Sequence, residues 1–201
     1  MAIGLMRYKT LTLPFKILTW SVAAEFIIAV LNHVFIRKKN NAPLLHLEAI
    51  TQFILYSLAY YYLFNGRKIK MLVIVSIAFI SVFFMVNALW LQPFAHAFPT
   101  NLNKATLALQ AVFSLLLFRQ MLLYPLATPI HKQAVFWFNT AIIFYSTTMF
   151  VDIGLSNIYR THSSFTVFSF CYWYTIVFIF TILTGIALLT DNKEIKKPYA
   201  L

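Results

Sequence analysis

Three carboxylates stand inside long apolar stretches of this sequence: Glu25, Glu48 and Asp152. The other two acidic residues, Asp191 and Glu194, are in the C-terminal tail. A charge at the centre of a bilayer costs about 2.5–3.5 kcal/mol on insertion scales, so such acids usually face the interior of a helix bundle and have a role there. The three embedded acids are therefore the first candidates for binding a ligand or relaying protons.

Other polar side chains accompany these acids at helical spacing. Residues three, four or seven apart lie on one face of a helix. The spacing predicts a narrow polar seam on each of four helices: Glu25 with Asn32, Glu48 with Gln52, Asn103 with Thr106 and Gln110, and Tyr145 with Thr148 and Asp152. Because a polar group away from water needs a partner, we expect the seams to face one another.

The seams have two interpretations. One is a functional site, and the other is hydrogen bonding that only holds helices together, worth about 0.6 kcal/mol on average. For the amide side chains we favour the second interpretation. For the acids both interpretations stay open, because a carboxylate costs more than an amide to place in a membrane for the same hydrogen bond. The amides in question are Gln52, Asn87, Gln110 and Asn139.

Four of the five histidines are expected at one end of the bundle, together with Glu48 and Asp152: His33, His46, His96 and His162. Imidazoles and carboxylates in one place could bind a metal, relay protons or sense pH. No H-x-x-x-H or H-E-x-x-H pair is present. The histidines are thus candidate metal ligands, but the sequence favours no particular cofactor.

Composition indicates the solvent around these residues. Hydrophobic residues make up 61% of the chain and charged residues 10%, against roughly 45–50% and 25% in soluble domains. The net charge is +11, but the basic residues form short clusters between apolar runs. That placement is typical of membrane-flanking charge and argues against nucleic-acid binding. The expected partner is a lipid bilayer.

Six runs reach the roughly 20 apolar residues that a membrane-spanning helix needs. We predict an all-α fold, a six-helix transmembrane bundle of antiparallel hairpins with no soluble domain. The expected divisions are an interfacial N-terminal segment over 1–16, the transmembrane domain over 17–189 and a short basic tail over 190–201. The predicted spans are Ile17–Ile36, Leu44–Phe64, Met71–Leu91, Ala105–Leu123, Ala134–Leu155 and Thr166–Leu189.

Orientation is predicted from Lys and Arg. Most of these residues fall on the side that holds both termini, which predicts cytoplasmic termini in a bacterial inner membrane. The histidine-rich end then faces outward. Aromatic residues near span ends, such as Tyr60–Tyr62, Trp90, Trp137 and Trp173, are interpreted as interfacial anchors.

Several segments carry a resemblance to a known group. These are the span around Glu25, LLHLEAITQF, AVFSLLLFRQMLLYP and FWFNTAIIFYSTTMFVDIGLSN. Together they resemble uncharacterised bacterial membrane proteins with six or seven helices, which are loosely similar to the membrane portions of seven-helix sensory proteins. In that pattern an acid commonly stands where this chain has Gln52. The resemblance implies a fold and a compartment and supplies no reaction.

Catalytic signatures are missing: there is no G-x-S-x-G, P-loop or G-x-G-x-x-G motif. The leading hypothesis is a non-enzymatic sensory, accessory or scaffold subunit that acts through other membrane subunits or a second copy. One alternative is a small transporter or proton-coupled carrier that uses the embedded acids. Another is a metal- or cofactor-dependent enzyme at the outer rim.

Overall fold

The computed structural model describes residues 1–36, 41–161 and 163–191, and side chains throughout these ranges except at 34–36, 156–161 and 163–170. All regular structure in this part of the chain is helical. The elements are α1 (Ala2–Met6), α2 (Leu13–Ile36), α3 (Ala42–Leu63), α4 (Arg67–Val86), a π-helical turn η1 (Asn87–Leu91), α5 (Thr100–Leu123), a 3₁₀ turn η2 (Ile130–Lys132), α6 (Ala134–Thr161) and α7 (Ser163–Thr190).

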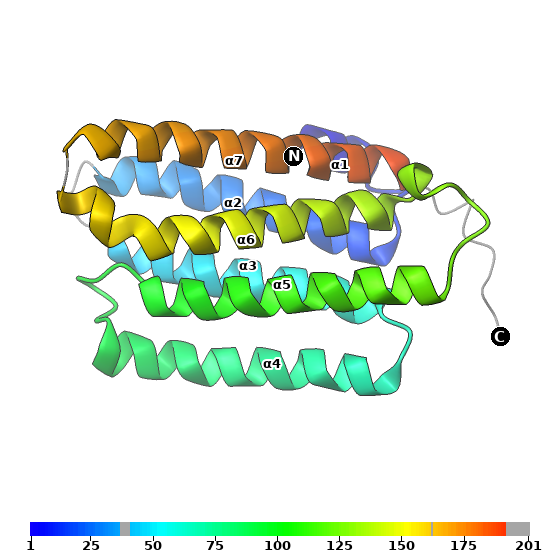
Figure 1. The fold of residues 1–201 in the computed structure, drawn as a ribbon, viewed down its shortest axis with the longest axis horizontal. Helices are drawn as coiled ribbons and strands as arrows, with labels where there is room; N and C mark the ends of the chain where they lie inside the picture. Colours follow the sequence, from blue (N-terminus) through cyan, green and yellow to red (C-terminus); the bar gives the residue numbers. More distant parts are fainter. Residues whose placement is uncertain (37–40, 162, 192–201) are drawn as a thin grey trace.

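The long helices lie side by side along one common direction (Figure 1). α3 packs against α2, α4 and α5, and α6 packs against α5 and α7. α4 is at one edge of the bundle, while α7 and the short α1 are at the opposite edge (Figure 1). The α3–α4 turn lies at the same end as the α5–α6 connection, and the α4–α5 connection lies at the other end.

Six helices within the described residues are long and apolar enough to cross a membrane. Their apolar segments coincide with the six predicted spans. Several helices begin or end outside those spans, because hydropathy locates the lipid-like stretch whereas polar residues continue the same helix beyond it. α5 begins at Thr100 rather than Ala105, and α2 begins at Leu13, with Pro14 in its first turn, where proline is tolerated.

A hydrogen-bonded node joins three helices in the core. The Tyr60 hydroxyl lies 2.5 Å from Ser114 Oγ and donates to Asn139 Oδ1 at 2.9 Å. The Asn139 amide donates to the Ser114 carbonyl oxygen at 2.9 Å. The interpretation of Tyr60 as an interfacial anchor was wrong, since its side chain is 0% exposed. Its ring fills the core because its hydroxyl has two partners there, as a buried tyrosine requires.

The N-terminal residues pack against the bundle. α1 contacts α2 and α7, and Gly4 is buried where an added Cβ would lie 2.6 Å from Thr19 Oγ1. The Arg7 guanidinium donates to the carbonyl oxygens of Leu188, Leu189 and Asp191. These carbonyls are at the end of α7, where helix carbonyls lack intrahelical partners. Arg7 thus caps α7 and ties the N-terminal segment to the end of that helix.

Candidate ligand-binding site

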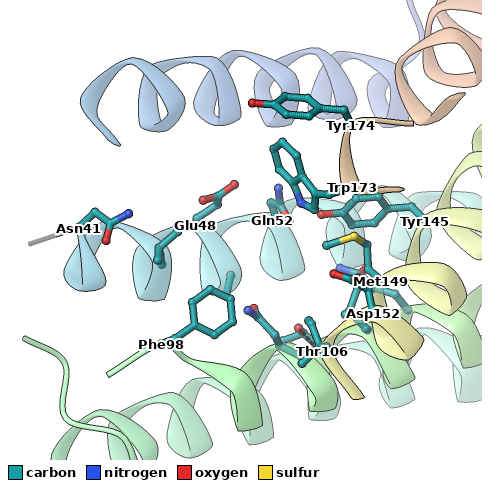
Figure 2. Close-up of a pocket in the computed structure, with 16 residues that line it drawn as sticks. Asn41, Glu48, Gln52, Phe98, Thr106, Tyr145, Met149, Asp152, Trp173 and Tyr174 are labelled. Carbon is teal, nitrogen blue, oxygen red and sulfur yellow. Dashed lines mark hydrogen bonds between the residues drawn. The ribbon is translucent and has the colours of Figure 1, made fainter. Parts of the chain in front are cut away.

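A cavity of about 490 Å³ lies among α3, α5, α6 and α7. It is nearer the end of the bundle where α4 joins α5, since Asn41 and Phe98 belong to its wall (Figure 2). Its volume falls in the range of about 300–1,000 Å³ that small-molecule sites occupy. The lining residues are Asn41, Leu45, Glu48, Ala49, Gln52, Phe98, Asn103, Thr106, Leu107, Gln110, Tyr145, Met149, Asp152, Ile153, Trp173 and Tyr174.

Three of the four predicted polar seams meet in this cavity. α3 contributes Glu48 and Gln52, which lie one turn apart on its inner face. α5 contributes Asn103, Thr106 and Gln110, and α6 contributes Tyr145 and Asp152 (Figure 2). Helical spacing places each set on one face, and the packing of α3, α5 and α6 turns these faces toward one volume. The residues Glu48, Gln52, Gln110 and Asp152, all predicted as site candidates, therefore lie together.

Two acceptors in the wall have no hydrogen-bond partner in the part of the chain that the structure describes. Gln110 is 3% exposed and its Oε1 is unpaired, and Asp152 Oδ1 is buried and likewise unpaired. Leaving a buried polar group unsatisfied costs about 1–3 kcal/mol, so native proteins rarely do so without a reason. Both atoms belong to residues that line the cavity. A bound ligand whose donors came within reach of these two atoms would satisfy them.

Glu25 stands apart from this wall. Its Oε1 accepts hydrogen bonds from Tyr56 on α3 at 2.5 Å and from Ser21 at 3.3 Å. Its carboxyl group also lies close enough to that of Glu48 for the two to interact electrostatically. Glu25 thus joins α2 to α3 beside the cavity, and the fourth predicted seam does not line it.

The histidines do not gather at this site in the part of the chain that the structure describes. His46 is buried beside the ring of Phe94, and its Nε2 lies 3.0 Å from the Ala97 carbonyl oxygen. His33 and His96 are exposed. Among the described residues, no three His, Cys, Asp or Glu side chains form a group that could hold a metal ion. His162, the fourth candidate ligand, lies outside the described residues.

No family model, curated protein or solved structure matches this chain. The site is therefore interpreted from the chemistry of its own residues. The cavity offers carboxylates, amides and aromatic faces around a partly apolar space. That mixture is typical of binding sites, in which a few polar groups orient a ligand that apolar side chains surround.

The aromatic wall was missed by sequence reasoning. Trp173 and Tyr174 of α7 and Phe98 border the cavity with 40%, 64% and 40% of their surfaces exposed (Figure 2). The place of Trp173 near a span end predicts an interfacial anchor instead. The sequence offers one sign of an aromatic wall: the run CYWY, which has no charged residue beside it in its apolar stretch. Only the packing of α7 on α6 brings Trp173 and Tyr174 to the same cavity as the acids.

Proposed function

We propose that this chain is a multi-pass protein of a bacterial cytoplasmic membrane whose six long helices form antiparallel hairpins across the bilayer. Support comes from the six helices that are long and apolar enough to span it. The excess of Lys and Arg on the side of both termini supports cytoplasmic termini. In this orientation the cavity lies in the outer half of the bundle.

Its proposed function is to bind a small ligand within the bundle and to act as a non-enzymatic sensory, accessory or scaffold subunit. The observation that carries this proposal is the convergence of Glu48, Gln110 and Asp152 on one cavity, with unpaired acceptor atoms in its wall. A bound ligand would contact α3, α5, α6 and α7 together, so it would stabilise one arrangement of these helices over others. A sensory role agrees with the resemblance to seven-helix sensory proteins.

A partner protein or a second copy would receive the signal. Apolar side chains cover the outer face of α4, including Ile74, Phe79 and Val82, which are more than half exposed. This face could contact either lipid or a neighbouring helix, because lipid tails are as apolar as the side chains of another helix.

Two measurements test the proposal. A thermal-unfolding screen in lipid nanodiscs, with anionic, neutral and cationic small molecules, should find a ligand that raises the melting temperature. A Gln110→Leu variant, which fills the wall without an acceptor, should lose that shift. Affinity purification in mild detergent should recover a partner or an oligomer. A lone monomer with measurable catalytic turnover would contradict the non-enzymatic role.

A proton-coupled carrier is the second candidate. The observation in its favour is that the carboxyl groups of Glu25 on α2 and Glu48 on α3 lie close enough to interact electrostatically. Neighbouring acids of this kind are a feature of proton relays in membranes. Flux into proteoliposomes, measured with Glu25→Gln and Glu48→Gln variants, tests it. Flux that neither substitution changes would reject an acid relay.

A further inference from the structure

We propose that the ligand of this cavity is a protonated organic amine, a molecule with an N–H-bearing cationic group next to an aromatic or aliphatic body. The inference rests on the proposed ligand-binding function and names the chemical class of that ligand. Charge, hydrogen-bonding capacity and aromatic surface in the cavity each point to this class.

Charge is the first argument. Glu48 and Asp152 line the cavity, and no Lys, Arg or His side chain is among its lining residues within the described ranges. This acidic lining is unusual in a chain that carries 16 basic and 5 acidic residues. A carboxylate removed from water is costly unless a positive group is near it. A cationic ligand would supply that group.

Hydrogen bonding narrows the class further. The unpaired wall atoms, Gln110 Oε1 and Asp152 Oδ1, are acceptors. A protonated primary amine has three donors and no acceptor, so it matches acceptor atoms of this kind while its charge meets the carboxylates. A quaternary ammonium has the same charge but no N–H, and it would leave both acceptors unsatisfied.

The rest of the wall accommodates the body of such a molecule. Trp173 and Tyr174 border the same cavity as Glu48 and Gln52 (Figure 2). Cations bind over the faces of tryptophan and tyrosine rings, with about 0.5–2 kcal/mol for each contact. Leu107 and Met149, both buried, provide apolar surface beside the acids.

A bare metal ion fits this cavity less well. A divalent ion needs several oxygen or nitrogen ligands at about 2.0–2.6 Å, and no such group of three His, Cys, Asp or Glu occurs in the described residues. A volume of about 490 Å³ is that of a site for an organic molecule.

The experiment compares four probes that share a phenylethyl group in calorimetric titrations of the full chain in nanodiscs: phenethylamine, its N,N,N-trimethyl derivative, 3-phenylpropionate and 2-phenylethanol. Heats from the Glu48→Gln/Asp152→Asn double variant are subtracted to remove partitioning into lipid. Phenethylamine should bind best, and the trimethyl derivative about tenfold more weakly, as expected for lost hydrogen bonds to charged or buried acceptors.

Single substitutions locate the binding. Glu48→Gln and Asp152→Asn should each weaken phenethylamine binding about tenfold or more, because each removes one charge from the wall. Glu48→Asp keeps that charge and should retain most of the affinity, which separates lost charge from misfolding. Glu25→Gln is the matched control, since it removes the same charge from a residue outside the wall. It should change affinity clearly less than Glu48→Gln does.

The outcomes separate the ligand class from the function. Stronger binding of 3-phenylpropionate or 2-phenylethanol in the same cavity would overturn the amine and leave the ligand-binding function standing. An equal affinity for the trimethyl derivative would overturn the hydrogen-bond argument and with it the proposed class. If none of the four probes bound, and the wider screen found no ligand either, both proposals would fall.

Discussion

The Tyr56 hydroxyl on α3 donates a hydrogen bond to Oε1 of Glu25 on α2, with 2.5 Å between the two oxygens. This pair accounts for one of the three embedded acids without any ligand. The contrast with Asp152 is direct, because its buried Oδ1 has no hydrogen-bond partner among the described residues. Glu25 therefore connects two helices, whereas Glu48 and Asp152 in the cavity wall are available to a ligand.

Removing the Tyr56 hydroxyl tests the structural role of Glu25. Tyr56→Phe should lower the free energy of unfolding by about 1–3 kcal/mol, because it removes a hydrogen bond from a partly buried carboxyl group. Tyr62→Phe is the control, since Tyr62 is 48% exposed. Chemical denaturation in detergent measures both. Equal effects of the two substitutions would show that the Glu25 contact contributes nothing particular.

The node around Tyr60 permits a sharper test of coupling. Tyr60→Phe and Asn139→Leu each remove the hydroxyl–amide hydrogen bond seen at 2.9 Å. Each should destabilise the bundle by about 1–2 kcal/mol. The double variant should lose less than the sum, since both changes remove one interaction. Strict additivity in a double-mutant cycle would mean that the two side chains do not interact.

Much of this arrangement follows from the sequence. Hydropathy predicts the six long apolar helices, and helical spacing predicts the polar faces of α3, α5 and α6 that line the cavity. Residue spacing shows which side chains share a face of a helix, but it does not show toward which neighbouring helix that face turns. The sequence therefore could not tell that the fourth seam, with Glu25, lies outside the cavity that the other three seams line. The places of Tyr60 and Trp173 at span ends are typical of interfacial anchors for the same reason. Helix packing instead directs Tyr60 into the core and Trp173 to the cavity.

Close packing of the N-terminal segment predicts a size limit at Gly4. Gly4→Ala should destabilise the contact between α1 and α2, because the new Cβ would lie 2.6 Å from Thr19 Oγ1. A Thr19→Ala substitution in the same chain should restore part of the loss. Gly154→Ala is the matched control: it meets nothing within 4 Å in α6, and we expect a gain of about 0.5–1 kcal/mol from helix propensity. Thermal unfolding of these three variants and the unsubstituted protein measures this, and a tolerated Gly4→Ala would contradict the tight contact.

Orientation is testable with single cysteines in intact cells. The native Cys171 is exposed, so the variants are built on Cys171→Ser. A membrane-impermeant maleimide should label Asn101→Cys, at the cavity end, and should not label Thr128→Cys, in the connection between α5 and α6. Both residues are exposed, so a difference reports sidedness. The reverse labelling pattern would place the termini outside and contradict the charge-based prediction.

The most direct test of the central claim is whether a ligand-sized molecule enters the cavity between α3, α5, α6 and α7. Gln52→Cys and Ser57→Cys, both on α3 in the Cys171→Ser background, differ in that Gln52 lines the cavity whereas Ser57 is fully buried outside its wall. The measurement is the rate at which a small cationic methanethiosulfonate reagent modifies each cysteine in nanodiscs, with and without phenethylamine. We predict rapid modification of the Gln52→Cys variant, slowed by phenethylamine, and little modification of the Ser57→Cys variant. Equal rates at the two positions, or no modification at position 52, would contradict the existence of an accessible binding cavity.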